Sequence, residues 1–233
     1  MGRDLKRLVS AGLDLLFPPR CCGCGGPGGL LCQGCEASAP TLELPYCGRC
    51  AHPGSHRATC GCGPLAVDGI RAPYLLEGPV RKAVHDLKYR NLRAAAPRLG
   101  GLLAAWMEKT SVPGELLVPI PLHRRQLRSR GYNQSAMLAR EVSKGTGLAL
   151  ARDALARVRD SAPQVSLPSR LERARNVEGG FRCVGDVRGA RVVLVDDVVT
   201  TGSTMSACAE ALKSAGARSV WGIALARQPY RAA

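Results

Sequence analysis

The sequence predicts an α/β protein in which a parallel sheet flanked by helices follows a small cysteine-rich module. Eight of the eleven cysteines fall as four close pairs between residues 21 and 62. From about residue 68 onward, short apolar runs alternate with amphipathic stretches of helical period, which is typical of the strands and helices of a parallel sheet. We therefore expect three parts: a helix at 1–20, the cysteine-rich module at 21–67 and the α/β domain at 68–233.

The composition narrows the class of partner. The 233 residues can bury a sizeable core without disulfides. The formal net charge is +15, from 33 Lys and Arg against 18 Asp and Glu. This excess favours an anionic partner, which could be a nucleic acid, a phosphorylated small molecule or a membrane surface. Aromatic residues make up 4% of the chain, which argues against a surface that stacks many bases.

Residues 1–20 predict an amphipathic helix, because their apolar residues recur at helical spacing with charged residues between them. Asp14 interrupts the apolar stretch and no small-residue cleavage site follows, so the segment lacks the features of an export signal. No apolar run approaches the ~20 residues that span a bilayer. We expect a cytoplasmic protein without a membrane span, whose N-terminal helix packs on the body; contact with a membrane surface is the alternative.

The four cysteine pairs predict two structural zinc sites. Three pairs have the spacing C-x-x-C, whose two-residue gap lets a tight turn aim both thiolates at one tetrahedral metal ion. Pairing in sequence order gives two four-sulfur sets, and a cross-braced pairing is the alternative. The two sets are Cys21, Cys24, Cys32 and Cys35, and Cys47, Cys50, Cys60 and Cys62. His52 and His56 are alternative ligands in the second set, and disulfides fit less well because no export signal is present.

The α/β part begins with a predicted strand at 73–76 and a helix that places Val80, Val84 and Leu87 on one face. Further strands are predicted at 116–122, 191–195 and 219–226, a basic loop at 124–130, and helices from 133 or 134 and from about 203.

Residues 191–208 carry the strongest functional signal. Four apolar residues, 192–195, predict a strand buried on both faces, and Asp196 and Asp197 follow where open α/β sheets bind ligands. The next residues offer hydroxyls and backbone amides ahead of a helix whose dipole favours anions, so they predict a phosphate site. These residues are Thr200, Thr201, Gly202, Ser203 and Thr204. A pentose 5-phosphate fits the combination of an acidic edge and a phosphate site.

VVLVDDVVTTGST at 192–204 resembles the phosphoribosyl-diphosphate motif of type I phosphoribosyltransferases. LLFPP before the cysteines, HDLKY at 85–89, VPIPL at 118–122 and RGYNQ at 130–134 are similar to the ComF family, in an order that covers nearly the whole chain. The resemblance implies a double zinc ribbon followed by a type I phosphoribosyltransferase domain that binds 5-phosphoribosyl diphosphate with Mg²⁺. It also implies an association with DNA uptake in natural competence, with single-stranded DNA and competence proteins as candidate partners.

The resemblance assigns two further segments. The basic segment after VPIPL corresponds to the loop that grips pyrophosphate, with Arg128, Arg130, Gly131 and Asn133 as its residues. The alternatives for this segment are a solvated basic loop or contacts to nucleic-acid phosphates. Residues 159–180 resemble the flexible loop that closes over the diphosphate, with the candidates Arg170, Arg173 and Asn176; a plain surface loop is the alternative. Lys88 is expected either to reach a phosphate or to cap a helix end.

The predicted reaction displaces pyrophosphate from C1 of the sugar. Asp196 and Asp197 are the predicted catalytic residues, which hold the ribose hydroxyls and stabilise positive charge on the sugar. The sequence identifies neither a general base nor an acceptor site. The alternative function is a non-catalytic sensor of 5-phosphoribosyl diphosphate or a protein that binds single-stranded DNA.

Overall fold

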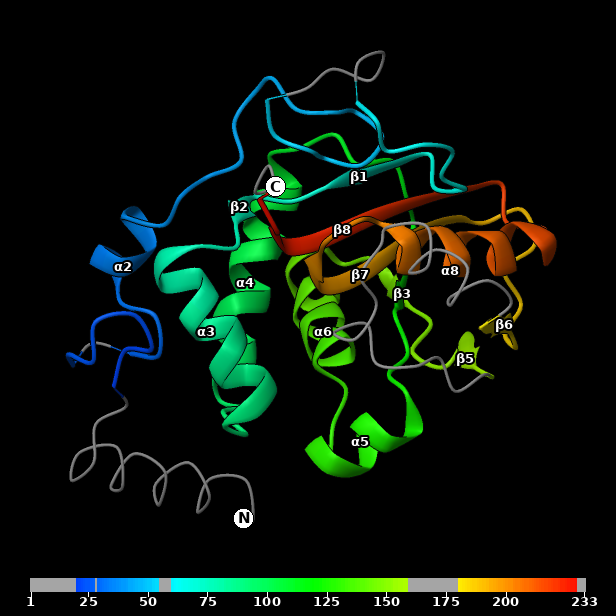
Figure 1. Ribbon diagram of the computed structural model, residues 1–233. Coiled ribbons are helices and arrows are strands. Elements are labelled where there is room, and N and C mark those ends of the chain that lie inside the picture. Colours follow the sequence, from blue (N-terminus) through cyan, green and yellow to red (C-terminus); the bar gives the residue numbers. More distant parts are fainter. Residues whose placement is uncertain (1–19, 28, 55–59, 159–179, 230–233) are drawn as a thin grey trace.

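The computed structural model describes residues 20–27, 29–54, 60–158 and 180–229 (Figure 1). The predicted N-terminal helix at 1–20 therefore lies outside the described residues, apart from Arg20. None of the described helices is long and apolar enough to cross a membrane.

A parallel sheet forms the centre of the molecule, as predicted (Figure 1). Its strand order is β1-β8-β7-β3-β4, and β2 pairs with β8 beyond the end of β1. The strands are β1 Gly69–Arg71, β2 Tyr74–Leu75, β3 Leu116–Pro119, β4 Ala149–Leu150, β7 Arg191–Val199 and β8 Ser219–Arg227. A separate antiparallel pair is formed by β5 Leu155–Arg157 and β6 Phe181–Cys183.

Helices cover both faces of the sheet (Figure 1). On one face lie α3 Gly78–Tyr89, α4 Ala95–Glu108 and α6 Gln134–Thr146, and on the other lies α8 Ser203–Ser214. Alternate residues of β7 serve the two layers, because successive side chains of a strand point to opposite faces. Val193 packs in the same core cluster as Leu138 of α6, whereas Leu194 packs with Leu212 of α8. The prediction that 192–195 are buried on both faces is confirmed.

Two of the predicted strands end three or four residues away from their predicted ends, whereas the other two differ by one residue. β7 does not stop before the acidic pair but continues through it to Val199, because β8 extends as far as Arg227 and keeps pairing with it. β3 ends at Pro119 rather than at 122. Pro121 lacks the N–H group that a further rung of the ladder would need.

The predicted basic loop at 124–130 is a helix, α5 Arg124–Arg130. Nδ1 of His123 caps its start by accepting the backbone N–H of Arg125 at 3.1 Å. Gly131, at φ 72°, ends the helix in the left-handed conformation, as expected for a residue that turns the chain. A run of Arg, Gln and Leu has good helix propensity, which outweighs the loop-like appearance of its charges.

The cysteine-rich segment contacts the sheet and helices at two separate places (Figure 1). Its first part, with α2 Gln33–Ala37, lies against α3, and the buried Cys21 and Cys35 join the same core cluster as Val84. Its second part runs along β1, where Arg71 donates a hydrogen bond to the carbonyl oxygen of Gly48 at 2.7 Å. The division near residue 68 stays a prediction.

Candidate functional site

A cavity of about 510 Å³ opens at the carboxyl ends of β3 and β7. Its walls come from the end of β7, the start of α8, the start of α6, the end of α3 and the segment from Ile120 through α5. Six of the residues predicted from the sequence line it: Asp196, Asp197, Thr200, Gly202, Thr204 and Arg130. The topology of the sheet thus brings the acidic pair, the phosphate loop and one predicted arginine to a single hollow.

The acidic pair is held by partners from two helices. Oδ2 of Asp197, a residue only 2% exposed, forms an ion pair with Nζ of Lys88 at 2.8 Å. Oδ1 of Asp196 accepts a hydrogen bond from Oγ of Ser135 at 2.7 Å and another from the backbone N–H of Asp197 at 2.9 Å. The two carboxylates are therefore fixed by α3 and α6, and each retains acceptor capacity toward the cavity because a carboxylate has about four lone-pair sites.

Burial and the neighbouring carboxylate of Asp197 raise the pKa of Asp196 to about 7, against the opposing effects of Lys88 and Ser135. For Lys88, burial disfavours the charged form, but the charge of Asp197 outweighs it and raises the pKa of the ammonium. The site thus holds the Lys88–Asp197 ion pair and, beside it, a second carboxyl group, that of Asp196, which loses its proton near neutral pH. A cationic ligand would stabilise the ionised form of that second carboxylate.

The predicted phosphate loop leads directly into α8. Gly202 precedes the helix at φ 84°, a left-handed conformation that favours glycine. A Cβ at this position would lie 2.9 Å from Cδ1 of Ile70, so the loop is also closely packed from behind. Thr200, Gly202 and Thr204 line the cavity. Thr201 and Ser203 are not among the lining residues; their hydroxyls lie 2.7 Å apart and hydrogen-bond each other, which fixes the shape of the turn.

The predicted pyrophosphate residues divide into one that faces the cavity and three that do not. Arg130 lines it, together with Arg125 and Gln126 of α5, whereas Arg128 does not. Positions 126 and 130 share a face because they are one helical turn apart, and position 128 is rotated away from that face. Gly131 caps α5.

Asn133 has a capping role in the structure. Its side-chain oxygen accepts the backbone N–H groups of Ser135 and Ala136, and its Nδ2 donates to the carbonyl oxygen of Ile120. These bonds fix the start of α6, so they also place Ser135 against the acidic pair. Contacts of Arg128, Gly131 and Asn133 with a diphosphate stay predictions.

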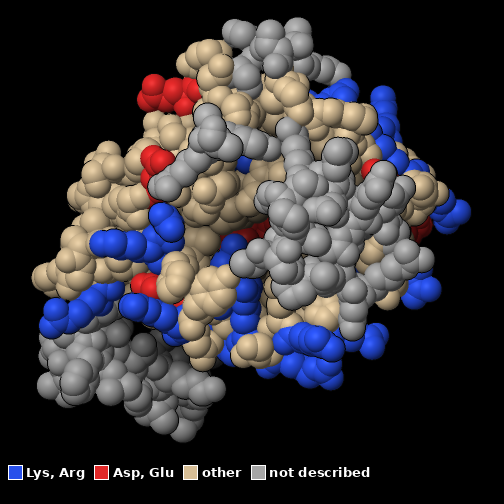
Figure 2. Space-filling model, in the orientation of Figure 1, with Lys and Arg blue, Asp and Glu red and all other residues tan. Residues whose placement is uncertain are grey.

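A second hollow, also of about 510 Å³, adjoins the first and shares Lys88, Arg125 and Arg130 with it. Tyr89 lines both hollows, and 67% of its surface is exposed. The guanidinium of Arg130 lies over the Tyr89 ring, 5.2 Å from its centroid. Lys and Arg side chains lie along the left, lower and right edges of the molecule in the view of Figure 2. No carboxylate lines the second hollow among the residues that the structure describes, which makes it suited to an anion.

The candidates for the flexible loop, Arg170, Arg173 and Asn176, lie outside the described residues. The structure describes what flanks them: β5 and β6 run antiparallel on either side of the segment 159–179. Arg157, the last residue of β5, lines the cavity.

Lys88, Tyr89, Ser135 and Arg157 are cavity residues that the sequence prediction either left undecided or missed. One signal was readable for Lys88. It lies four residues after Val84, so it continues the apolar face of its helix and must point toward the body. Ser135 and Arg157 offered no comparable signal, because their positions depend on how α6 and β5 meet the sheet.

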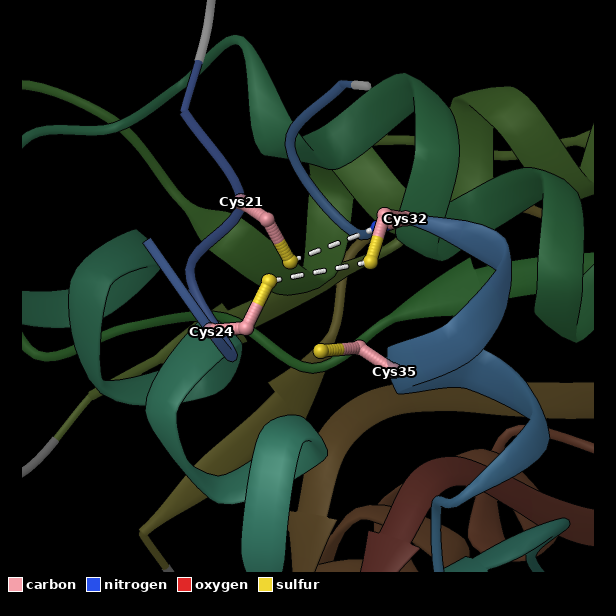
Figure 3. A group of neighbouring side chains, drawn as sticks. All are labelled: Cys21, Cys24, Cys32 and Cys35. Atoms are coloured by element: carbon pink, nitrogen blue, oxygen red, sulfur yellow. Dashed lines mark hydrogen bonds between the residues drawn. The ribbon is translucent and has the colours of Figure 1, made fainter. Parts of the chain in front are cut away.

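The eight paired cysteines gather into two groups of four, in sequence order. The first group is Cys21, Cys24, Cys32 and Cys35 (Figure 3), and the second is Cys47, Cys50, Cys60 and Cys62. Within each group the sulfur atoms all lie within 4.8 Å of one another. This grouping disagrees with the cross-braced alternative. His52 belongs to neither group, and His56 lies outside the described residues.

The geometry of both groups fits a zinc ion. Tetrahedral Zn²⁺ with Zn–S bonds of about 2.3 Å requires sulfur atoms ~3.8 Å apart. Sγ of Cys24 lies 3.8 Å from Sγ of Cys32, and Sγ of Cys50 lies 3.5 Å from Sγ of Cys60. Burial raises the pKa of the Cys21 thiol, but hydrogen bonds from backbone N–H groups outweigh this effect and lower the pKa to about 6. The lowered pKa favours the thiolate, which is the form that binds metal.

Two family models match the chain. A double zinc ribbon domain matches residues 12–62, and a phosphoribosyl transferase domain matches residues 131–232. The chain is 34% identical to the DNA utilization protein YhgH of Escherichia coli strain K12 over 82% of this chain and 81% of that protein. It is 29% identical to competence protein F of Haemophilus influenzae over 84% of this chain and 90% of that protein.

Among solved structures, the glutamine phosphoribosylpyrophosphate amidotransferase of B. subtilis aligns with a TM-score of 0.39 and 26% identity, over 56% of this chain and 26% of that chain. The two domain matches follow one another in the order of the sequence, and the relatives match along most of their length. The chain therefore belongs to the ComF family, in which a double zinc ribbon precedes a phosphoribosyltransferase domain.

Proposed function

We propose that this chain binds 5-phosphoribosyl diphosphate with Mg²⁺ in the cavity at the ends of β3 and β7 and transfers the phosphoribosyl group to an acceptor nucleophile. The observation that carries the proposal is the placement of the acidic pair beside a phosphate-type loop in one cavity with four cationic side chains, Lys88, Arg125, Arg130 and Arg157. An acidic edge, a phosphate loop and a basic wall in one hollow match a ligand whose ribose hydroxyls lie between a 5-phosphate and a diphosphate.

The 5-phosphate is assigned to the loop before α8. The first turn of a helix presents backbone N–H groups that have no partner within the helix, and its dipole favours a dianion there. Gly202 allows the backbone to approach the ligand closely, and Thr200 and Thr204 supply hydroxyls from the cavity wall. Thr201 and Ser203 support the turn through their mutual hydrogen bond.

The ribose is assigned to Asp196 and Asp197. Their carboxylates would accept hydrogen bonds from the two ring hydroxyls and would stabilise the positive charge that grows on the sugar as the bond to pyrophosphate lengthens. Lys88 and Ser135 keep both carboxylates in place, so little reorganisation is needed when that charge develops.

The pyrophosphate is assigned to the basic wall. Arg125 and Arg130 of α5 both line the cavity, and a guanidinium binds phosphate oxygens through two parallel hydrogen bonds. These arginines would stabilise the negative charge of the departing group. Mg²⁺ prefers oxygen ligands, so the carboxylates of Asp196 and Asp197 are the side chains that fit it, and it would neutralise diphosphate charge.

Zinc is assigned a structural role. A shell of four sulfur atoms leaves no open position for a substrate or a water molecule. Both cysteine groups lie apart from the residues that line the cavity. The names of the relatives, DNA utilization protein and competence protein, support a role of the transfer reaction in the handling of DNA.

Calorimetry with 5-phosphoribosyl diphosphate and Mg²⁺ tests the binding step. We expect Asp196→Asn combined with Asp197→Asn to weaken binding on the order of 100-fold or more, because the ribose hydroxyls and Mg²⁺ lose two charged oxygen acceptors. Asp186→Asn is the matched control, since Asp186 is an exposed aspartate that pairs with Arg188. Zinc content, measured in parallel, should not change. Unaltered binding by the double variant would overturn the assignment of the pocket.

Transfer itself is tested by following pyrophosphate release with amines, nucleobases and nucleic acids as acceptors. Release that depends on one class of acceptor identifies the second substrate. If ligand binds but neither transfer nor hydrolysis occurs with any acceptor, the chain is a sensor of 5-phosphoribosyl diphosphate.

Binding of single-stranded DNA is a second candidate function, favoured by the exposed ring of Tyr89 beside Arg130. A base could stack on this ring while its phosphates contact the arginines. Tyr89→Ala should then weaken binding of a labelled oligonucleotide on the order of 10-fold, and affinity should fall steeply with salt. Absent or salt-independent binding would remove this candidate.

A further inference from the structure

We propose that the buried Arg227 is a positioning residue that aims the backbone amides of the phosphate loop into the cavity. The inference rests on the proposed binding of a 5-phosphate at that loop. It concerns a side chain that does not touch the ligand, because Arg227 is not among the residues that line the cavity.

Arg227 is the last residue of β8, and only 1% of its surface is exposed. Its Nη1 donates hydrogen bonds to the carbonyl oxygens of Val199 at 3.1 Å and Gln228 at 3.2 Å, and also to the carbonyl oxygen of Thr200. Val199 is the last residue of β7 and Thr200 is the first of the loop. One buried nitrogen therefore holds the point at which the strand becomes the phosphate loop.

The direction of these carbonyls determines the direction of the amides that follow them. In a trans peptide unit, the C=O of one residue and the N–H of the next point in opposite directions. Because the carbonyls of Val199 and Thr200 point to the guanidinium, the N–H groups of Thr200 and Thr201 point away from it. Val199, Thr200 and Gly202 line the cavity and Arg227 does not, so the guanidinium approaches the loop from its rear.

The charge of Arg227 acts in the same direction as its hydrogen bonds. A guanidinium stays protonated in proteins, so its burial places a permanent positive charge behind the loop. Electrostatic interactions are stronger in a low-dielectric interior than in water. A phosphate dianion at the loop would be stabilised both by the aligned amides and by this charge.

The competing explanation is that Arg227 stabilises the fold alone. The two explanations differ in which part of the ligand they affect. If Arg227 positions the loop, its loss weakens binding of ligands that carry the 5-phosphate. If Arg227 only stabilises the fold, its loss weakens binding at both ends of the site. Ribose 5-phosphate and magnesium pyrophosphate are probes for the two ends.

We would titrate the full chain and its variants with each probe by calorimetry and record thermal melting in parallel. Arg227→Met removes the charge and the donors, and Arg227→Lys keeps the charge but shortens the reach. Arg182→Met is the matched control, since Arg182 is an exposed arginine of β6. We expect Arg227→Met to weaken ribose 5-phosphate about 10-fold or more, which is the effect of losing hydrogen bonds to a charged donor. Pyrophosphate affinity should stay within about twofold, and Arg227→Lys should be intermediate.

Equal losses for both probes, or no loss for either, would overturn the positioning role. If Arg227→Met does not fold, Arg227→Lys decides by the same comparison: a selective loss of ribose 5-phosphate supports the proposal and an unselective or absent loss overturns it. If the unmodified chain binds pyrophosphate but not ribose 5-phosphate, the assignment of the loop fails and the role of Arg227 fails with it. If it binds neither probe, the proposed function itself is wrong.

Discussion

Replacing Asp196 by asparagine should stabilise the ligand-free protein near neutral pH. The site holds two carboxylates next to each other, and only Asp197 has a lysine partner. Asparagine keeps an oxygen that can accept the hydrogen bonds from Ser135 and from the backbone N–H of Asp197, but it removes one partly buried charge.

The size and the sign of the effect follow from the pKa of Asp196, which burial and the charge of Asp197 raise from 3.8 to about 7. The folded protein therefore holds this proton more tightly than the unfolded chain does. The contribution of Asp196 to the free energy of unfolding is fully present below pH ~4. It is lost as the pH rises through 7, and the total loss is up to about 4 kcal/mol. Asparagine does not titrate, so its advantage over aspartate should grow across this range to about 2–4 kcal/mol.

Urea denaturation of both proteins at several values between pH 5 and 8, with zinc content verified at each pH, measures this difference. The exposed Asp186 provides the control, because its hydrogen bonds with Arg188 lower the pKa of its carboxyl and Asp186→Asn should therefore bring no gain. A gain for Asp196→Asn that does not depend on pH, or no gain at pH 8, would refute this reasoning.

Three further substitutions test other contacts of the site. Gly202→Ala should weaken ribose 5-phosphate binding about 10-fold or more, measured by calorimetry, because alanine is strained at φ 84° and its Cβ would press on the core. Lys88→Met should lower the free energy of unfolding by about 3 kcal/mol in urea titrations, since it leaves a buried carboxylate unpaired, and adding Asp197→Asn should recover most of the loss. Arg125→Ala should weaken binding of magnesium pyrophosphate about 10-fold while Arg128→Ala changes it less than about twofold, because Arg125 lines the cavity and Arg128 does not.

The sequence allowed prediction of those features that depend on neighbours along the chain. The strand at 192–195 follows from four consecutive apolar residues, and the acidic pair follows it directly. The two cysteine groups follow from spacing, because the two members of each pair are joined by one or two residues and the pairs themselves are close in sequence. Sequence order therefore matched spatial order in these cases.

Features that depend on distant segments could not be predicted in this way. Lys88 reaches Asp197 across more than a hundred residues of chain, and Ser135 reaches Asp196 because Asn133 fixes the start of α6. The length of β7 was underestimated because its end is set by pairing with β8, not by its own residues. The sequence predicts a loop at α5 because four arginines in seven residues suggest a solvated segment, while the cap from His123 is recognisable only in the folded chain.

The cysteine-rich segment is connected physically to the phosphate loop, although none of its described residues lines the cavity. Leu65 follows the second cysteine group by three residues and lies, with Ile70, directly behind Gly202. The next residue, Ala66, donates its backbone N–H to Oγ of Ser206 in the first turn of α8 at 2.9 Å. The rear of the loop is thus held by Arg227 at its beginning and by residues 65–70 at its end. A metal ion that closes the second cysteine group would therefore help to hold the loop in the conformation that binds phosphate, even though the two sites share no ligand.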